Sequence, residues 1–151
     1  MTVRGCDMTE EQTEKNFTLR AFDMMRDYET ICAWWERWKW TPLPPQYLSS
    51  NGFVAEVNGV PLAVTFLFIT DADFCLMEFL VVNPDLPRAD RMTGVDMVVK
   101  AAQDLCVAKN YSALFTTTNN PFLKKKLPEL GFIMAEENVT HLVWPVTGGG
   151  E

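Results

Sequence analysis

Three apolar stretches with very short connections constrain the fold of this chain more than any other feature. They cover residues 52–57, 61–70 and 74–82. An Asn-Gly pair at 58–59, a strong signal for a tight turn, separates the first two stretches, and residues 71–73 separate the last two. Such connections predict an antiparallel β-meander. The third stretch is almost wholly apolar, which is typical of a central strand covered on both faces.

Helices and further strands flank the meander. Residues 17–22 alternate apolar and polar side chains and predict a half-buried strand, whereas residues 26–39 repeat apolar side chains at helical spacing. The proline-rich segment 41–45 must end that helix. After the meander, an apolar stripe at helical spacing predicts a helix over 92–109, and a strand over 111–118 follows.

The C-terminal part predicts a short helix and a final hairpin. Asn120-Pro121 opens a helix that runs through Leu130. Residues 132–135 and 140–146 are expected to form the two strands of the hairpin. The expected order is therefore β-α-β-β-β-α-β-α-β-β, an α/β domain with a mixed, mostly antiparallel sheet flanked by helices.

Length and composition favour one domain. The chain has 151 residues, and we expect a flexible acidic lead-in over 1–15, a single domain over 16–146 and a flexible tail over 147–151. No apolar run approaches the ~18 residues of a membrane span, and the N-terminus lacks the apolar core of a signal peptide, so we expect a cytoplasmic protein. The net charge of −7 argues against a general binder of nucleic acids or anionic membranes and suits cationic partners such as amines.

The cysteines and the single histidine argue against disulfides and metal sites. Cys6, Cys32, Cys75 and Cys106 lie far apart and form no Cys-x-x-Cys motif. Three of them lie inside apolar patterns, which favours free buried thiols in a reducing compartment. With only one histidine, no zinc site is expected.

Two motifs carry a resemblance to a known family. The first joins the segment Leu80–Val82 and an Asn-Pro turn to the segment Arg91–Asp96, which opens the helix after the meander. The second is Asn120 followed by the Gly-Phe pair at 131–132. In these motifs, and in the order of its elements over 16–146, the chain resembles the GNAT superfamily of acyl-CoA-dependent N-acyltransferases.

The resemblance implies a site for acetyl-CoA or another acyl-CoA. Its pantetheine arm would enter a split between the third strand of the meander and the strand over 111–118, and its diphosphate would lie at the N-terminus of the next helix. A helix N-terminus presents free N–H groups, a glycine there lets an anion come close, and arginines add positive charge. The expected cofactor-binding residues are Leu80, Val81, Val82, Arg88, Arg91, Met92, Thr93, Gly94, Val95 and Asn120.

Two positions depart from the family's pattern. Asp96 stands where the family has Gly or Ala, and a carboxylate near a diphosphate costs roughly 1–3 kcal/mol. Thr93 and Asp96 also fit the spacing of a capping box, which would occupy the N–H groups that a phosphate needs. Leu127 stands where many members have a tyrosine that protonates the leaving thiolate.

Glu78 is the candidate catalytic base. It is the only ionised residue in the third apolar stretch, and by strand alternation it shares a face with Leu80 and Val82. In a dry cleft its pKa would rise toward the range useful for taking a proton from an ammonium group, and many GNAT enzymes have a glutamate on this strand in that role. The alternative is a structural ion pair with a residue such as Arg20 or Lys100.

Four tryptophans gather between residues 34 and 40. Helical spacing assigns Trp35 and Trp38 to the core, whereas Trp34 and Trp40 cannot fully share that stripe. Together with Tyr47, these two would form either an aromatic wall of the substrate site, as the resemblance implies, or a patch that docks another protein.

Two functions stay open at this point. The first is an N-acyltransferase, in which Glu78 deprotonates an amine that attacks the thioester in a ternary complex and a backbone N–H near 80–82 polarises the acyl carbonyl. The second is a catalytically degenerate GNAT-like domain that binds another protein. The acceptor is an unspecified amine, on a small molecule or a protein, and a homodimer is compatible with either function.

Overall fold

Residues 15–146 are described by the computed structural model of this chain. The chain forms two compact units, one ending at Thr117 and the other beginning at Thr118. The expected tail over 147–151 lies outside the described residues, as does the expected lead-in apart from Lys15. The single domain over 16–146 stays a prediction.

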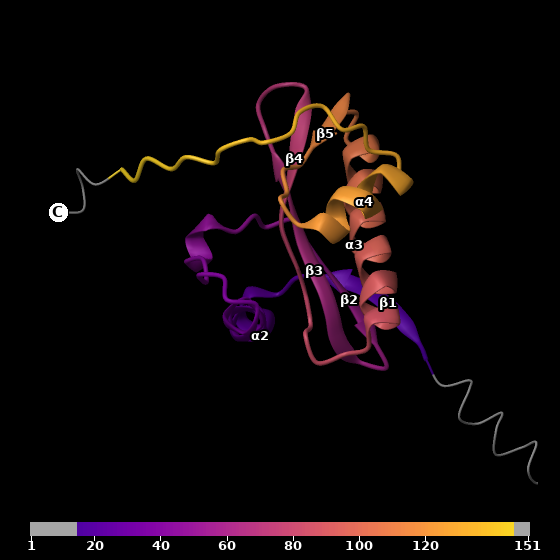
Figure 1. The fold of residues 1–151 in the computed structure, drawn as a ribbon. Helices are drawn as coiled ribbons and strands as arrows, with labels where there is room; N and C mark the ends of the chain where they lie inside the picture. Colours follow the sequence, from indigo (N-terminus) through magenta and orange to yellow (C-terminus); the bar gives the residue numbers. More distant parts are fainter. Residues whose placement is uncertain (1–14, 147–151) are drawn as a thin grey trace, which may run out of the picture. The chain divides into compact units, whose positions relative to one another are not determined.

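The first unit is built around a five-stranded sheet (Figure 1). Its strands lie in chain order, with antiparallel neighbours from β1 to β4 and with β5 parallel to β4. The strands are β1 (Phe17–Ala21), β2 (Gly52–Val57), β3 (Val60–Ile69), β4 (Phe74–Val82) and β5 (Ala113–Phe115). The predicted meander and the mixed, mostly antiparallel sheet are confirmed.

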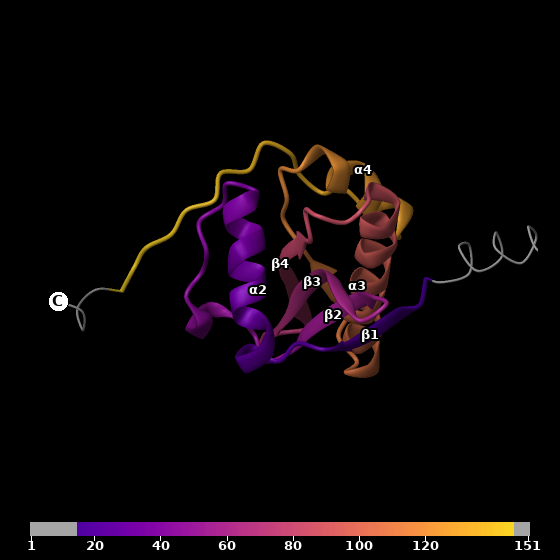
Figure 2. The same cartoon turned by 90° about the horizontal axis from the view of Figure 1, so that it is seen from below.

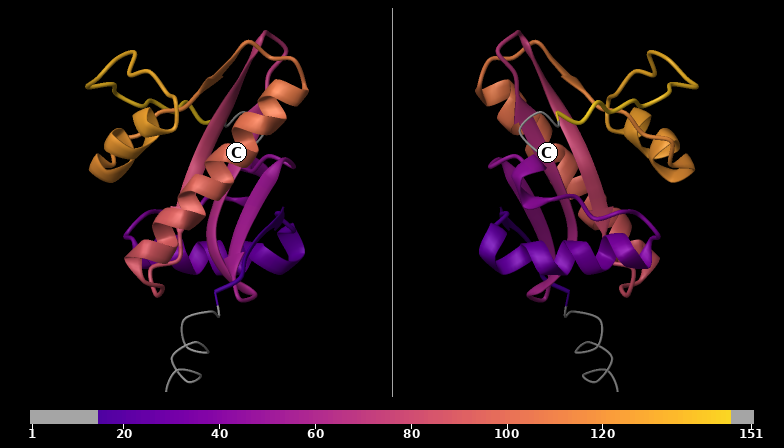
Figure 3. Two further views of the ribbon diagram at one scale, coloured as in Figure 1. Left: turned by 90° about the vertical axis from the view of Figure 1, so that its right-hand side faces the viewer. Right: turned by 90° about the vertical axis from the view of Figure 1, so that its left-hand side faces the viewer.

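Two helices, α2 (Met24–Arg37) and α3 (Arg88–Ala108), cover opposite faces of this sheet (Figures 2 and 3). The Asp23 side chain caps α2 by accepting a hydrogen bond from the Met25 N–H at 3.1 Å, so the helix begins slightly before the predicted range. A short 3₁₀ helix, η1 (Pro45–Tyr47), follows in the proline-rich segment. This arrangement gives the sheet a core on each face.

The two cores identify the face to which a strand residue points. The core under α2 consists of Ile31, Trp34, Trp35, Val54, Val64, Phe66 and Val81. The core under α3 consists of Ala55, Ala63 and Val98, with Leu80 and Val82 packed against it. The positions of β4 can therefore be assigned to one helix or the other.

The first turn of α3 begins at Arg88 rather than at the predicted residue 92. Pro87 occupies the N-cap, and its fixed φ suits the entry into a helix. Thr93 therefore lies in the second turn, where its hydroxyl donates to the Ala89 carbonyl at 3.3 Å. The capping box predicted for Thr93 and Asp96 is wrong, because the helix has already begun when the chain reaches them.

The position of Gly94 is set by close packing between α3 and β3. A Cβ added there would lie 2.6 Å from Cγ of Leu62 and 3.1 Å from Cβ of Ala63, and both neighbours are fully buried. A side chain at this position would push the helix away from the sheet. The close approach of α3 to β3 thus accounts for the glycine.

In the second unit, α4 (Pro121–Glu129) is the predicted short helix. Asn120 caps it, because its side-chain oxygen accepts hydrogen bonds from the N–H groups of Phe122 and Leu123 at 2.8 and 3.2 Å. Leu127 is buried.

The hairpin predicted over 132–135 and 140–146 is wrong, because the described residues 132–146 form no strand. Their apolar side chains other than Phe132 are exposed; Ile133 keeps 90% of its surface and Trp144 keeps 87%. Without burial, little offsets the entropy lost in ordering a two-stranded hairpin, which is marginal on its own.

Three cysteines are free thiols, as expected: Cys32, Cys75 and Cys106, whereas Cys6 lies outside the described residues. Burial and the neighbouring Cys106 raise the pKa of the Cys75 thiol to about 11. No helix in residues 15–146 is long and apolar enough to span a bilayer. In the same residues no three His, Cys, Asp or Glu side chains gather as metal ligands would.

Candidate active site

A β-bulge interrupts β4 next to Glu78. The pairs Phe66–Glu78 and Val64–Val81 leave one residue of β3 opposite two residues of β4. The first of these two, Phe79, has a φ of 63°, a left-handed conformation that is uncommon for a residue other than glycine. Bulges bend a strand and redirect its side chains, and they are frequent beside active sites.

The bulge places Glu78 on the α2 face of the sheet. Its partner Phe66 belongs to the core under α2, and paired residues of antiparallel strands point to the same face. Leu80 and Val82 pack against the core under α3 instead. The prediction that Glu78 shares a face with them is therefore wrong, because the extra residue of the bulge shifts the alternation.

Glu78 is half-buried, and no described residue forms an ion pair with it. Arg20 pairs with Asp27 at 2.8 Å and Lys100 pairs with Asp104 at 3.2 Å, so the ion pairs considered from the sequence are not made. Burial alone raises the pKa of the Glu78 carboxyl to about 7. At neutral pH this carboxyl is poised to take up or release a proton.

The strands β4 and β5 separate after a short pairing, and the predicted split is confirmed. They pair only over residues 74–76 and 113–115. The Thr116 hydroxyl then donates to the Met77 carbonyl at 2.6 Å, and no strand of the described residues follows on this side of β4. Residues 78–82 therefore form an open edge, with backbone groups directed away from β3.

The indole of Trp38 lies at the C-terminal end of this open edge. The Asn83 N–H donates to the Leu62 carbonyl on β3, and the C=O and N–H of one trans peptide point in opposite directions, so the Val82 carbonyl points away from β3. Nε1 of Trp38 donates to that carbonyl at 2.9 Å. The guanidinium carbon of Arg91 lies 5.7 Å from the centroid of the Trp38 ring.

The first turn of α3, Arg88 to Asp90, adjoins this corner and is the candidate anion site. A helix N-terminus carries a partial positive charge. The buried Asp90 carboxylate also lies in this turn, and it pairs with Lys15 at 2.8 Å. The candidate site therefore holds negative charge of its own as well as the arginines.

The other predicted cofactor residues lie further along the chain. Met92, Thr93 and Val95 lie after the first turn of α3, where N–H groups bond to carbonyls of the same helix. Val95 is buried. Asn120 caps α4 in the second unit. Four of the predicted cofactor-binding residues lie on the open edge of β4 or at its end: Leu80, Val81, Val82 and Arg91.

The aromatic residues expected at the substrate site divide into buried and exposed ones. Trp34 is only 5% exposed and belongs to the core under α2, and its place in a substrate wall stays a prediction. Trp40 and Tyr47 are 43% and 55% exposed. Trp40 stacks on Trp38 with ring centroids 6.4 Å apart.

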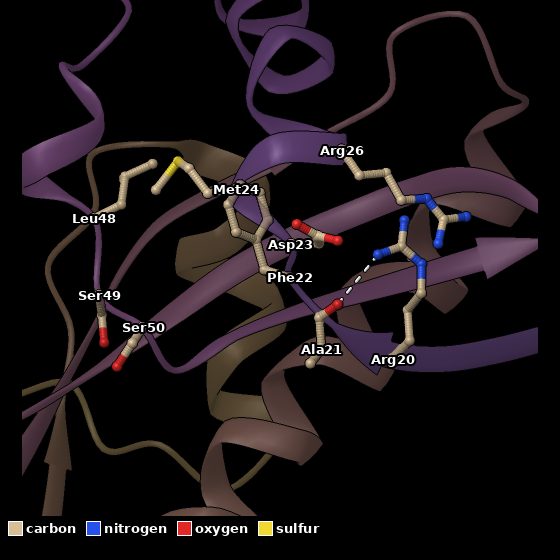
Figure 4. A pocket seen from close by; sticks show the side chains of 9 residues that line it. All are labelled: Arg20, Ala21, Phe22, Asp23, Met24, Arg26, Leu48, Ser49 and Ser50. Atoms are coloured by element: carbon tan, nitrogen blue, oxygen red, sulfur yellow. Dashed lines mark hydrogen bonds between the residues drawn. The ribbon is translucent and has the colours of Figure 1, made fainter.

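A pocket of about 600 Å³ lies beside the start of α2 (Figure 4). Its lining includes the apolar residues Phe22, Met24 and Leu48 and the polar residues Arg26, Ser49 and Ser50. Phe22 packs edge-on against Phe66, the partner of Glu78, with ring centroids 4.9 Å apart. The pocket therefore shares the α2 face with Glu78 but does not contain it.

Sequence reasoning missed the bulge, the pocket and the contacts of Trp38. The stretch 74–82 reads as an ordinary strand, and no glycine marks the bulge. Helical spacing assigned Trp38 to the core, and its place near the end of the helix was the only sign of a role at the sheet edge.

No protein-family model matches the sequence, and no curated protein matches it. Its structure matches solved N-acetyltransferases. A ribosomal-protein-alanine N-acetyltransferase from Escherichia coli is 17% identical, with a TM-score of 0.65 over 80% of each chain. An aminoglycoside N-acetyltransferase solved with coenzyme A is 14% identical, with a TM-score of 0.62 over 85% of this chain and 100% of that one. Glucosamine-6-phosphate N-acetyltransferase from Arabidopsis thaliana is 11% identical, with a TM-score of 0.60 over 85% and 98%.

Proposed function

From the GNAT fold that this chain shares with those N-acetyltransferases, we propose that it transfers an acetyl or similar acyl group from coenzyme A to an amine. Glu78 carries the proposal. It is a half-buried carboxylate beside a bulge, it forms no ion pair with a described residue, and burial raises its pKa to about 7. These properties suit a general base that works near neutral pH.

The chain's own groups suit an acyl-CoA. The open edge of β4 offers backbone donors and acceptors to the amides of an extended pantetheine arm, much as a sheet edge accepts a peptide. The N-terminus of α3 and the Arg91 guanidinium suit a diphosphate. The bound molecule would supply an acyl group activated as a thioester.

Glu78 takes a proton from the acceptor ammonium, directly or through one water. The lone pair of the amine nitrogen then attacks the acyl carbonyl carbon. The new C–N bond replaces the C–S bond, and the nitrogen releases its second proton to water. A backbone N–H beside the bulge polarises the carbonyl oxygen. Leu127 has no proton to give, but a thiol of pKa about 8.5 can leave as its thiolate without an acid, and water then protonates the sulfur.

Calorimetry with coenzyme A and acetyl-CoA tests binding, and release of free thiol in the presence of amines tests transfer. Suitable acceptors are an aminoglycoside, glucosamine 6-phosphate and a peptide that begins with alanine. Glu78→Gln should lower the rate by about 10²–10⁴-fold and leave the affinity for coenzyme A nearly unchanged. The kcat/KM of the wild type should rise with pH and level off above about 7.

Glu36→Gln is the matched control, because Glu36 is exposed on α2. It should change neither the rate nor the affinity. Full turnover by Glu78→Gln would exclude Glu78 as the base. Absence of binding at millimolar coenzyme A would exclude the transferase.

The second candidate is a catalytically degenerate domain that binds another protein. One observation favours it: the buried Asp90 carboxylate, which pairs with Lys15, adds negative charge to the first turn of α3, where a diphosphate would bind. The exposed Trp40 and Tyr47 would then belong to the docking surface. The coenzyme A titration decides between the two candidates.

A further inference from the structure

We infer that Trp38 is a positioning residue that holds the Arg91 guanidinium at the end of the open edge of β4, ready for the diphosphate of an acyl-CoA. This inference rests on the proposed function. Trp38 follows α2 on one face of the sheet, and Arg91 belongs to α3 on the other (Figure 2). Their contact joins the two helices around the end of β4.

The Trp38 ring is fixed on several sides. Nε1 donates to the Val82 carbonyl at 2.9 Å, which ties the indole to the last residue of β4. The ring of Trp40 stacks on it, with the two planes 29° apart. The Trp38 backbone N–H donates to the Trp34 carbonyl at 3.0 Å, which ties the residue to the last turn of α2. The indole is therefore a rigid platform.

Arg91 contacts an aromatic ring, whereas two other arginines of the first unit contact carboxylates. Arg20 and Arg37 bind carboxylates at 2.8 and 2.7 Å. Arg91 forms no ion pair within residues 15–146, and its guanidinium lies over the Trp38 ring. An aromatic face holds a guanidinium without using its N–H donors, which stay available for phosphate oxygens.

The loop between β4 and α3 is held in place as well. The Asn83 side chain donates to the Pro61 carbonyl at 2.9 Å and accepts from the Asp85 N–H at 2.9 Å. Arg37 at the end of α2 pairs with Asp85 at 2.7 Å. A site that is already ordered loses less entropy when a ligand binds.

The test is the affinity for coenzyme A, measured by calorimetry on the full chain, with pantetheine as the probe that lacks the diphosphate. Trp38→Leu removes the platform and should weaken coenzyme A binding by about 10-fold, within the range of a cation–π contact. Trp38→Phe keeps an aromatic face and should stay within about 3-fold of the wild type. Neither change should weaken the binding of pantetheine, because the contact between Trp38 and Arg91 serves the diphosphate alone.

Arg91→Gln supplies the second half of a double-mutant cycle. It should weaken coenzyme A binding by at least as much as Trp38→Leu, and adding Trp38→Leu to it should cost less than about 2-fold more. An equal loss with and without Arg91, or a loss shared by pantetheine, would overturn the inference and leave the proposed function standing. A wild type that binds no coenzyme A would instead overturn the proposed function. Thermal melting of each variant shows whether it folds.

Discussion

A carboxylate in the position of Glu78 lowers the stability of the fold at neutral pH. Its pKa of about 7 lies above the ordinary value of 4.5, so the folded chain binds this proton more tightly than the unfolded chain does. Stability is therefore highest below pH 4.5 for this group and falls as the pH rises to about 7. The proposed role of Glu78 as a base would explain this cost, because the perturbed pKa is useful in proton transfer.

Glu78→Gln should accordingly be more stable than the wild type at pH 8, by about 1–2 kcal/mol once solvent screening is allowed for. The gain should vanish at pH 4, where both side chains are neutral. Urea unfolding at the two pH values measures it, and Glu36→Gln, on an exposed site, should gain little at either. A gain that does not change with pH would show that burial does not perturb this carboxyl.

Gly94 gives a second prediction for a single residue. Gly94→Ala should lower the free energy of unfolding by about 1–2 kcal/mol, because the strain of overpacking exceeds the gain in helix propensity. The new methyl group would lie 2.6 Å from Leu62 Cγ. In a Leu62→Ala background, where only the contact with Cβ of Ala63 at 3.1 Å remains, the same change should cost much less. Denaturant unfolding of the four proteins measures the difference, and equal effects in both backgrounds would contradict the packing role.

At the scale of elements, an ion-pair network fixes the start of α2 on the sheet. Arg20 of β1 binds both oxygens of the buried Asp27 at 2.8 Å, and its Nε donates to Glu56 of β2 at 2.9 Å. Burial by itself would raise the pKa of Asp27, but the hydrogen bonds from Arg20 and the Asp23 N–H outweigh it and lower the pKa. The network thus ties one helix to two strands.

Asp27→Asn should destabilise the fold by about 2–4 kcal/mol, because it leaves Arg20 with one of its two carboxylates. The lowered pKa makes the contribution of Asp27 present above about pH 4, and it should fade as the pH falls further. Chemical unfolding at pH 7 and pH 3 measures both effects. The control is Asp104→Asn, which breaks an exposed pair with Lys100 and should cost less than about 0.5 kcal/mol. Equal costs for the two variants would contradict this account of Asp27.

The elements were far more predictable from the sequence than the details of the site. Periodicity predicted the meander and both helices of the first unit, because each is set by local patterns. The bulge at Phe79 depends on pairing with β3, which no local pattern records. The early start of α3 follows Pro87, a local signal that apolar periodicity does not include. Glu78 could be identified from the sequence because a lone charge in an apolar strand is visible there. The face of the sheet to which Glu78 points could not be predicted, because it depends on the bulge.

At the scale of the whole molecule, every residue that the two proposals use lies in the first of the two units. Glu78, Trp38, Arg91 and the open edge of residues 78–82 all belong to the unit that ends at Thr117. Asn120 and Leu127, which the resemblance implicated, belong to the other unit. The proposed base, the open edge and the platform for Arg91 are therefore all built from the sheet and the helices that cover it.

The separation of β4 from β5 also bears on how the protein behaves at high concentration. A strand edge with unpaired backbone groups is a template for a strand of any other chain, including a second copy of this one. The ligand that fills the edge would then protect the protein from aggregation as well as serve its chemistry. The same feature that opens the proposed binding site would make the solubility of the empty protein depend on what occupies that edge.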